Sequence, residues 1–235
     1  CMRSVAKGWS NKLACDVFVY HSGGVSFGES SARQKEATRI LIGRHPRYPV
    51  LVQRHVLENP ANAYRIAVTA QRIRNSGKRV FLSVTHALGG GTGQYASDLI
   101  RLTANDAIWL SLRPFRPDCV ILECHQPGYQ FSLRLNPAAE HEQLTTVLSA
   151  CGVERIHIHH VLGHSVDLQR LVDDLGVPFD FTAHDYYTIC PQVTLSDEDG
   201  RYCGEPGEVG CDQCLAKRPS SSSGLDIVSW RAQLS

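Results

Sequence analysis

The sequence lacks any run of eighteen apolar residues, so we expect no helix that spans a membrane. It also lacks an excess of either charge, because 24 Lys and Arg balance 23 Asp and Glu to a net charge of +1. Such a balance gives no basic footprint for nucleic acid. No signal peptide opens the chain, since Cys1 and Met2 lead into a polar segment. We therefore expect a cytoplasmic protein, free or peripheral to the inner membrane, with no nucleic-acid partner.

An initiator methionine is missing at position 1, and residues 225–235 have the pattern of a helix that has barely begun. We therefore expect the 235 residues to be an excerpt of a longer protein. Residues 1–60 would be the tail of a preceding domain, 61–78 a basic connector with a solvated charged face, and 79–219 an α/β domain. Residues 220–235 would be a linker and the start of another helix.

The middle of the chain predicts a strand, a helix and a second strand. Apolar residues alternate with histidines over Ile156–Val161, which is typical of a strand. Val166–Leu175 carries apolar residues at helical spacing, with Ser165 as the expected N-cap and Gly176 as the stop. Phe179–Ala183 is a second short apolar run. In parallel sheets, ligands collect at the carboxyl ends of strands. Those ends carry His159, His160, His164, His184 and Asp185.

The preceding residues extend this pattern into a complete α/β domain. Arg79–Thr85 has the composition of a buried strand, and we expect a helix from Gln94 to about Ala104 after it. Further strands, an edge strand and a helix are expected over Ala107–Leu112, Asp118–Glu123, Tyr129–Leu135 and Pro137–Gly152. This order predicts a Rossmann-like three-layer domain with a mainly parallel sheet.

A glycine-rich stretch, Gly89–Gly93, joins the first strand to the first helix of this domain. Glycines there allow backbone N–H groups to approach an anionic or polyhydroxylated ligand at a helix N-terminus. The stretch lacks both the GxGxxG dinucleotide fingerprint and the GK[ST] of a P-loop, so we expect no NAD. A flexible tight turn explains the glycines equally well.

The first sixty residues contain too little apolar pattern for a core. We expect a strand over Cys15–His21 and helices over Ser30–Gly43 and Val50–Glu58. The segment VYHSGGVSFG resembles the end of a family 2 (GT-A) glycosyltransferase domain. That resemblance implies that His21 helps to hold a metal and a nucleotide diphosphate, although the acidic motif expected upstream is absent. Taken without the resemblance, His21 is an ordinary strand-end histidine.

Three longer motifs, THALGGGTGQYASDL, HHVLGHSVDLQRLVDDLGVPFDFTAHDYYTICP and GRYCGEPGEVGCDQC, together resemble the N-terminal, acceptor-side domain of family 4 (GT-B) glycosyltransferases. The resemblance implies transfer of a sugar from a nucleotide-sugar donor to a glycan or lipid-linked acceptor in cell-surface polysaccharide synthesis. It also implies that a C-terminal donor-binding domain is missing here, so we expect this piece alone to be inactive. By the resemblance, Gly90 and Gly91 would line the cleft and His184 would be the active-site histidine. From their positions at strand ends and in the glycine-rich stretch, we add Asp185 as a catalytic candidate and Thr92, His125, His160 and His164 as substrate-binding candidates.

The chemistry of sugar transfer suits these residue types. The site must stabilise a departing diphosphate and position an acceptor hydroxyl, and the amides of the glycine stretch can do part of the first task. His184 can hydrogen-bond the donor sugar. Asp185 either orients the His184 imidazole or caps the next turn of the chain, and the sequence leaves both open.

Four of the nine cysteines form the pattern C-x12-C-x7-C-x2-C: Cys190, Cys203, Cys211 and Cys214. Four thiolates at such spacing suit a structural, tetrahedral zinc ion that pins a long loop, with glycines supplying the turns of a compact knuckle. Two disulfides or four free thiols are the alternatives. Cys119, Cys124 and Cys151 lie in apolar contexts and are expected to be core residues.

Two other kinds of function compete with sugar transfer. A Rossmann-type nucleotide-dependent enzyme, such as an epimerase or dehydrogenase, fits the fold. The missing GxGxxG and the lack of a Tyr-x-x-x-Lys pair count against it. A non-catalytic, zinc-stabilised binding module is the third possibility.

Overall fold

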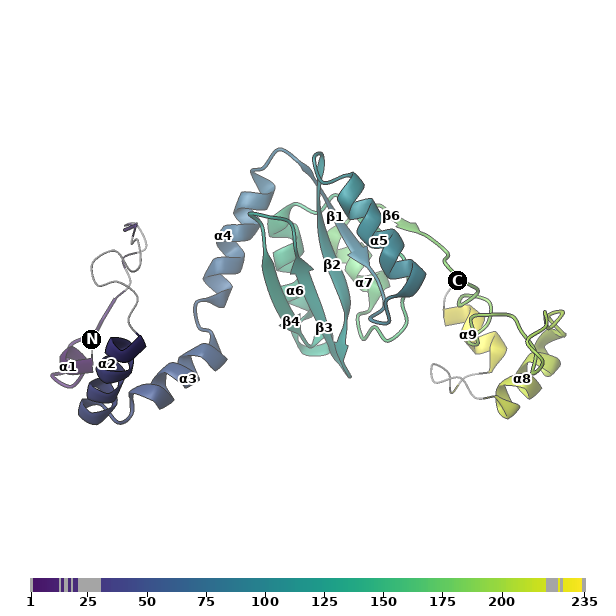
Figure 1. Cartoon of the computed structure of the whole chain (residues 1–235). Coiled ribbons are helices and arrows are strands. Elements are labelled where there is room, and N and C mark those ends of the chain that lie inside the picture. The colour runs from purple at the N-terminus through teal and green to yellow at the C-terminus, as the bar shows by residue number, and fades with distance from the viewer. Residues whose placement is uncertain are drawn as a thin grey trace. The chain divides into compact units, whose positions relative to one another are not determined.

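The computed structural model describes residues 2–12, 14, 17, 19, 20, 31–218, 224 and 226–233. The chain divides into two units, residues 1–62 and 63–235, which are considered separately. The helices of the first unit are α1 Met2–Val5, α2 Ser31–Arg44 and α3 Tyr48–Glu58, and they bury none of their described residues (Figure 1). The two longer helices are confirmed. His21 and most of the strand expected over Cys15–His21 lie outside the described residues.

The second unit contains a six-stranded sheet in the order β4-β3-β2-β1-β5-β6. Its strands are β1 Arg79–Val84, β2 Ala107–Arg116, β3 Cys119–Cys124, β4 Phe131–Leu135, β5 Arg155–Ile158 and β6 Phe179–Phe181. β1 pairs in parallel with β2 and β5, and β5 pairs in parallel with β6. The β2–β3 and β3–β4 pairs are antiparallel. The expected α/β class and the β4 edge strand are confirmed.

The sheet is mixed rather than simply parallel, and the reason is the length of one connection. Two residues, Pro117 and Asp118, join β2 to β3, and Asp118 has a φ of 59°. A parallel pair needs a crossover of a dozen or more residues, whereas two residues suffice for a hairpin. β3 therefore turns back along β2, and its carboxyl end lies at the opposite edge of the sheet from the carboxyl ends of β1 and β5.

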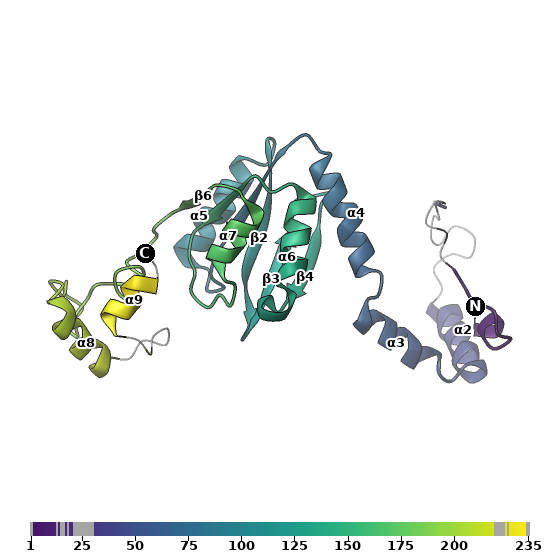
Figure 2. The same ribbon diagram turned by 180° about the vertical axis from the view of Figure 1, so that it is seen from behind.

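Helices cover both faces of the sheet. α5 Gly90–Leu102 lies on one face, and α6 Pro137–Cys151 and α7 Leu168–Leu175 lie on the other (Figures 1 and 2). Because both faces are covered, β1 buries consecutive residues, and Leu82 and Val84 are fully inaccessible to solvent. These side chains belong to one core that extends from β4 to α7.

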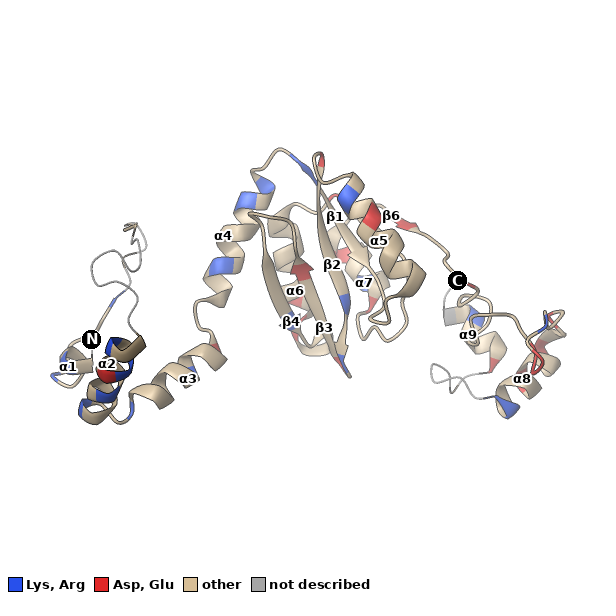
Figure 3. Cartoon of the chain, in the orientation of Figure 1, with Lys and Arg blue, Asp and Glu red and all other residues tan. Residues whose placement is uncertain are grey.

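The segment expected as a basic connector forms helix α4 Asn62–Arg74, which also packs on this domain. Ile66, Ala70 and Ile73 are buried and belong to the same core as the strands. The arginines of α4 are exposed (Figure 3), and two of them reach the sheet domain: Arg74 donates to the Ser149 carbonyl at 3.0 Å, and Arg72 lies 5.8 Å from the centre of the Tyr129 ring. α4 therefore combines the solvated basic face expected from its charges with a buried apolar face.

Most helix ends follow the expected residues, with two corrections. Gly152 and Gly176 end α6 and α7 with φ values of 78° and 61°. Asp167, rather than Ser165, caps α7, because its Oδ1 accepts the Arg170 N–H at 3.0 Å. α5 begins at Gly90 rather than Gln94, since positive φ at Gly89 and Gly90 completes the turn within two residues.

After β6, residues 186–218 and 226–233 form what we call the cysteine lobe. It contains α8 Gly207–Lys217 and α9 Ile227–Gln233, and an isolated bridge between Ser196 and Tyr202. Cys211 and Cys214 lie on α8 rather than in a knuckle built from turns. The linker expected over residues 220–223 lies outside the described residues.

Candidate functional site

The carboxyl ends of β1 and β5 define a topological switch point. These strands are neighbours, but β1 leads through α5 to β2 on one side, whereas β5 leads through α7 to β6 on the other. Successive connections that diverge in this way leave a crevice outside the strand ends, which is where α/β sheets bind ligands. The glycine-rich stretch follows β1, and His184 and Asp185 follow β6.

A cavity of about 570 Å³ occupies this position. Its lining consists of His86, Leu88, Gly89, Gly90, Gly91, Thr92, Tyr95, His184 and Asp185. Five residues expected at the site, from segments some ninety residues apart, are therefore brought together: Gly90, Gly91, Thr92, His184 and Asp185. The N-terminus of α5 adds backbone N–H groups that have no partner within the helix.

The glycines at the start of α5 are needed for the conformation of the chain. Gly89 has φ 72° and ψ −133°, a region that is open essentially only to glycine. A Cβ atom at Gly90 or Gly91 would meet nothing within 4 Å, so these residues face open space. A ligand could therefore approach the backbone at the helix N-terminus closely.

His184 is held by a second histidine that lies behind it. Its Nε2 lies 3.2 Å from Nδ1 of His159, which is only 1% exposed. Burial, together with the neighbouring His184 and His157, lowers the pKa of His159 to about 4. Burial also lowers the pKa of His184, against the opposing effect of Asp185. Both imidazoles are therefore neutral at pH 7.

The hydrogen bond between the two imidazoles favours one arrangement of protons. Nε2 of His159 is buried without a hydrogen-bond partner among the described residues. A bare acceptor there costs less than an orphaned N–H donor. We therefore place the proton of His159 on Nδ1, from which it is donated to Nε2 of His184. His184 then carries its own proton on Nδ1 and has that nitrogen for a ligand in the cavity.

Asp185 caps the next turn of the chain, the second of the two roles expected for it. Its Oδ1 accepts the Tyr187 N–H at 2.8 Å, which caps the next turn, and its Oδ2 lies 3.3 Å from Nε2 of His160. Nδ1 of His160 accepts the Leu162 N–H at 3.1 Å, so the proton of His160 is on Nε2 and points to Asp185. Asp185 is thus oriented by His160, rather than itself orienting His184.

Three histidines expected to bind substrate do not line the cavity. His160 is buried between the rings of His86 and Tyr187, at centroid distances of 4.8 and 4.4 Å. His164 bonds the Thr85 carbonyl through Nε2 at 2.9 Å and connects two strand ends; burial lowers its pKa to about 4. His125 follows β3 at the opposite edge of the sheet, with a side chain 76% exposed.

Two side chains of the cavity, His86 and Tyr95, were not expected from the sequence, and His159 was placed at a strand end without a role of its own. His86 lies between the end of β1 and the glycine-rich stretch. Its position after a strand is a signal that could have identified it as a site residue. Tyr95 lies one turn into α5, and its ring is 5.2 Å from that of His184 and 5.5 Å from that of His159. His159 has the same sequence context as His160, so no local signal separates the histidine behind His184 from the one behind Asp185.

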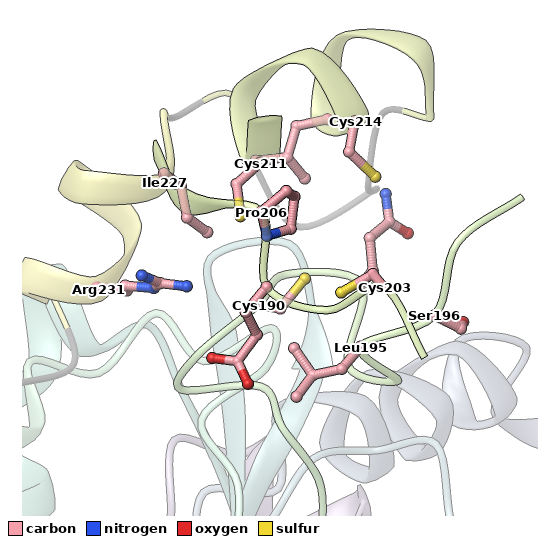
Figure 4. A pocket seen from close by; sticks show the side chains of 12 residues that line it. Cys190, Leu195, Ser196, Cys203, Pro206, Cys211, Cys214, Ile227 and Arg231 are labelled. Atoms are coloured by element: carbon pink, nitrogen blue, oxygen red, sulfur yellow. The ribbon is translucent and has the colours of Figure 1, made fainter. Parts of the chain in front are cut away.

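The four clustered cysteines line a separate cavity of about 40 Å³ in the cysteine lobe (Figure 4). All are free thiols, and burial raises the pKa values of Cys190 and Cys211. Within the described part of the chain, no group of three or more His, Cys, Asp or Glu side chains is already arranged to hold a metal ion. Cys124 and Cys151 are buried elsewhere, in the sheet domain, as expected, and Cys119 is half-buried.

The fold and the site define an α/β domain with a ligand cavity at its switch point. Among the described residues, no helix has both the length and the apolar character needed to cross a bilayer. No protein-family model matches the chain, and neither a curated protein nor a solved structure is significantly similar to it.

Proposed function

We propose that this chain is the acceptor-side half of a GT-B glycosyltransferase, with a Rossmann-like fold. It would transfer a sugar from a nucleotide-sugar donor to a glycan or lipid-linked acceptor, at or near the inner membrane, in cell-surface polysaccharide synthesis. The observation that supports this is the composition of the switch-point cavity. It combines a helix N-terminus, neutral His184 and Tyr95 with no Lys or Arg among its described lining residues.

The cavity offers the groups that a departing diphosphate and a sugar require. Unpartnered N–H groups at the start of α5 can donate to phosphate oxygens. The Nδ1–H of His184 can donate to a hydroxyl of the transferred sugar, and His159 holds the ring in that orientation at 3.2 Å. In the transition state, negative charge builds up on the leaving diphosphate. The N–H groups at the start of α5 already point toward that charge, so they stabilise it without having to reorient, and the barrier is lowered.

The absence of Lys and Arg from the described cavity lining indicates that this chain supplies only part of the site. A nucleotide diphosphate carries at least two negative charges, and neutral donors alone neutralise none of them. We propose that a second, donor-binding domain supplies the cations when it closes over the cavity. This arrangement distinguishes a two-domain transferase from a self-contained nucleotide enzyme.

Binding experiments on the 235-residue chain test this distinction. We expect nucleotide diphosphates and nucleotide sugars to bind weakly, with Kd values on the order of millimolar, or about −4 kcal/mol. Saturation-transfer NMR with a panel of nucleotide sugars and NAD would measure this. Micromolar binding of NAD, or of any nucleotide sugar, would contradict the two-domain proposal and favour the self-contained Rossmann-type enzyme.

A kinetic experiment tests the role of His184. In an active protein that contains this chain together with a donor-binding domain, His184→Ala should lower kcat/KM by about 10²-fold, or roughly 2.7 kcal/mol. His125→Ala provides the contrast, because His125 lies at the opposite edge of the sheet and should have little effect. Equal losses of kcat/KM in the two variants would rule out the switch-point cavity as the active site.

A further inference from the structure

We propose that Cys190, Cys203, Cys211 and Cys214 together bind one zinc ion as a closed structural site. All four line the same cavity of about 40 Å³, whose size suits an ion rather than an organic ligand (Figure 4). This metal site does not depend on the proposed sugar transfer.

Three separate pieces of the cysteine lobe converge on this cavity. Cys190 lies in the segment that leaves the candidate site, Cys203 follows the Ser196–Tyr202 bridge, and Cys211 and Cys214 lie on α8. The two α8 cysteines are three residues apart, so they share one face of the helix. The other described cysteines, Cys119, Cys124 and Cys151, do not line this cavity. Four thiols with no open position match the ligand set of structural zinc.

The lobe also lacks the apolar core that would hold these pieces together. Its buried apolar residues, among those described, are Pro191, Leu195, Ile227 and Trp230. Meanwhile Val193, Leu195 and Glu205 have φ values of 59°, 48° and 48°. Each such non-glycine residue costs on the order of 1–3 kcal/mol and persists only where its surroundings impose it. A metal ion that joins the three pieces supplies this constraint.

Closing the tetrahedron requires movement of the side chains. No three ligands are already at metal-binding distances among the described residues. Rotation about the Cα–Cβ bond moves a cysteine sulfur between staggered positions while the backbone stays in place. The proposal requires that such rotations bring the four sulfurs around one ion, from positions that already line one small cavity.

Zinc binding would stabilise one wall of the candidate site. The Cys190 N–H donates to the Tyr186 carbonyl at 2.8 Å, and the Trp230 indole donates to the Tyr187 carbonyl at 2.8 Å. The Tyr187 ring in turn packs on His160, which orients Asp185. The ion would thus keep Asp185 in place from outside the cavity.

Elemental analysis of the 235-residue chain, purified without chelator, tests the proposal. We expect about one zinc ion per chain, and a clear loss of metal in Cys190→Ser and in Cys214→Ser. Cys119→Ser is the matched control, since Cys119 is a free, half-buried thiol outside the cavity, and it should retain the metal.

Cobalt substitution of the unmutated chain provides a second measurement that does not depend on whether the variants fold. Tetrahedral thiolate coordination should give intense visible d–d bands and sulfur-to-cobalt charge-transfer absorption. Less than about a tenth of an equivalent of metal, with either four reactive thiols or two disulfides found by alkylation and mass spectrometry, would overturn the proposal.

Discussion

The sheet domain and the cysteine lobe are built in different ways, although they are continuous in sequence. The sheet domain buries long aliphatic side chains from each of its central strands, and two of its helices, α6 and α7, are capped at both ends, although α5 has no side-chain cap. The lobe buries two such side chains, Leu195 and Ile227, among its described residues, and α8 begins at Gly207 without a side-chain cap. Apolar burial therefore stabilises the sheet domain more than the lobe, for which the proposed metal ion would supply a cross-link.

The two regions also differ in what they contribute to the candidate site. The sheet places the cavity at its switch point and supplies the helix N-terminus and His184. The lobe contacts the site from outside, through the Tyr187 ring, which packs on His160, and Trp230 packs on Tyr187. The sheet thus provides the cavity, and the lobe supports one wall of it. Three further predictions test this division of roles, from the largest expected effect to the smallest.

The largest effect should come from a cavity in the sheet core. Leu82→Ala removes a fully buried side chain from the central strand and should lower the free energy of unfolding of the sheet by about 2–5 kcal/mol. Leu195→Ala, in the lobe, should leave that transition in place. Two tryptophans allow the regions to be followed separately in urea: Trp109 in β2 and Trp230 in α9. If both signals move together in both variants, the two regions form one cooperative unit.

An intermediate effect should appear on acidification. The folded pKa of His159 is lowered to about 4, below its unfolded value of 6.5, so between these values the unfolded chain binds a proton that the folded chain excludes. The contribution of neutral His159 to the free energy of unfolding is complete above pH 6.5, and it is lost as the pH falls toward 4. At pH 4 the loss should reach about 3 kcal/mol.

Urea unfolding at several pH values measures this loss. His159→Phe keeps a ring in the same space but cannot titrate, so its stability should fall less steeply between pH 7 and pH 4 than that of the unmutated protein. His125→Phe, at an exposed position, should keep the full slope. Identical slopes in all three proteins would show that His159 is not buried as described.

The smallest effects should come from the helix ends. Asp167→Ala removes the cap of α7 and should cost about 1 kcal/mol in the transition reported by Trp109. Glu208→Ala removes an acidic residue from the first turn of α8, which has no side-chain cap, and should cost about 0.3 kcal/mol in the lobe. Ser165→Ala should have no effect on α7; a cost equal to that of Asp167→Ala would restore Ser165 as the cap.

Much of the sheet domain could be predicted from local pattern. Apolar periodicity located β1, β5 and the helices to within a few residues, and glycines marked the ends of α6 and α7. The errors occurred where two residues competed for one role. Ser165 and Asp167 are both good N-caps, and only the geometry of the turn after β5 decides that Asp167 reaches the Arg170 N–H. The direction of β3 follows from the two-residue connection between β2 and β3, whereas the apolar composition of the strand carries no information about direction.

The candidate site was predicted in part. Gly90, Gly91, Thr92, His184 and Asp185 were found because they follow strands that were correctly located. His125 lies away from the switch-point cavity because a residue after a strand shares the ligand edge only if that strand runs parallel to its neighbours. His159 and His160 are adjacent residues with opposite faces. One supports His184 and the other supports Asp185, a distinction that depends on the partner that each ring meets.

The amino-acid sequence by itself determined the order and type of the elements in the sheet domain, because periodicity, caps and turns act over a few residues. Only the tertiary structure decided which strand ends share an edge, and which histidines meet. It also decided that four cysteines from three segments share one cavity. These features arise between residues in separate segments, up to about 90 positions apart at the switch-point cavity, and their energies depend on burial and distance, which no local pattern contains.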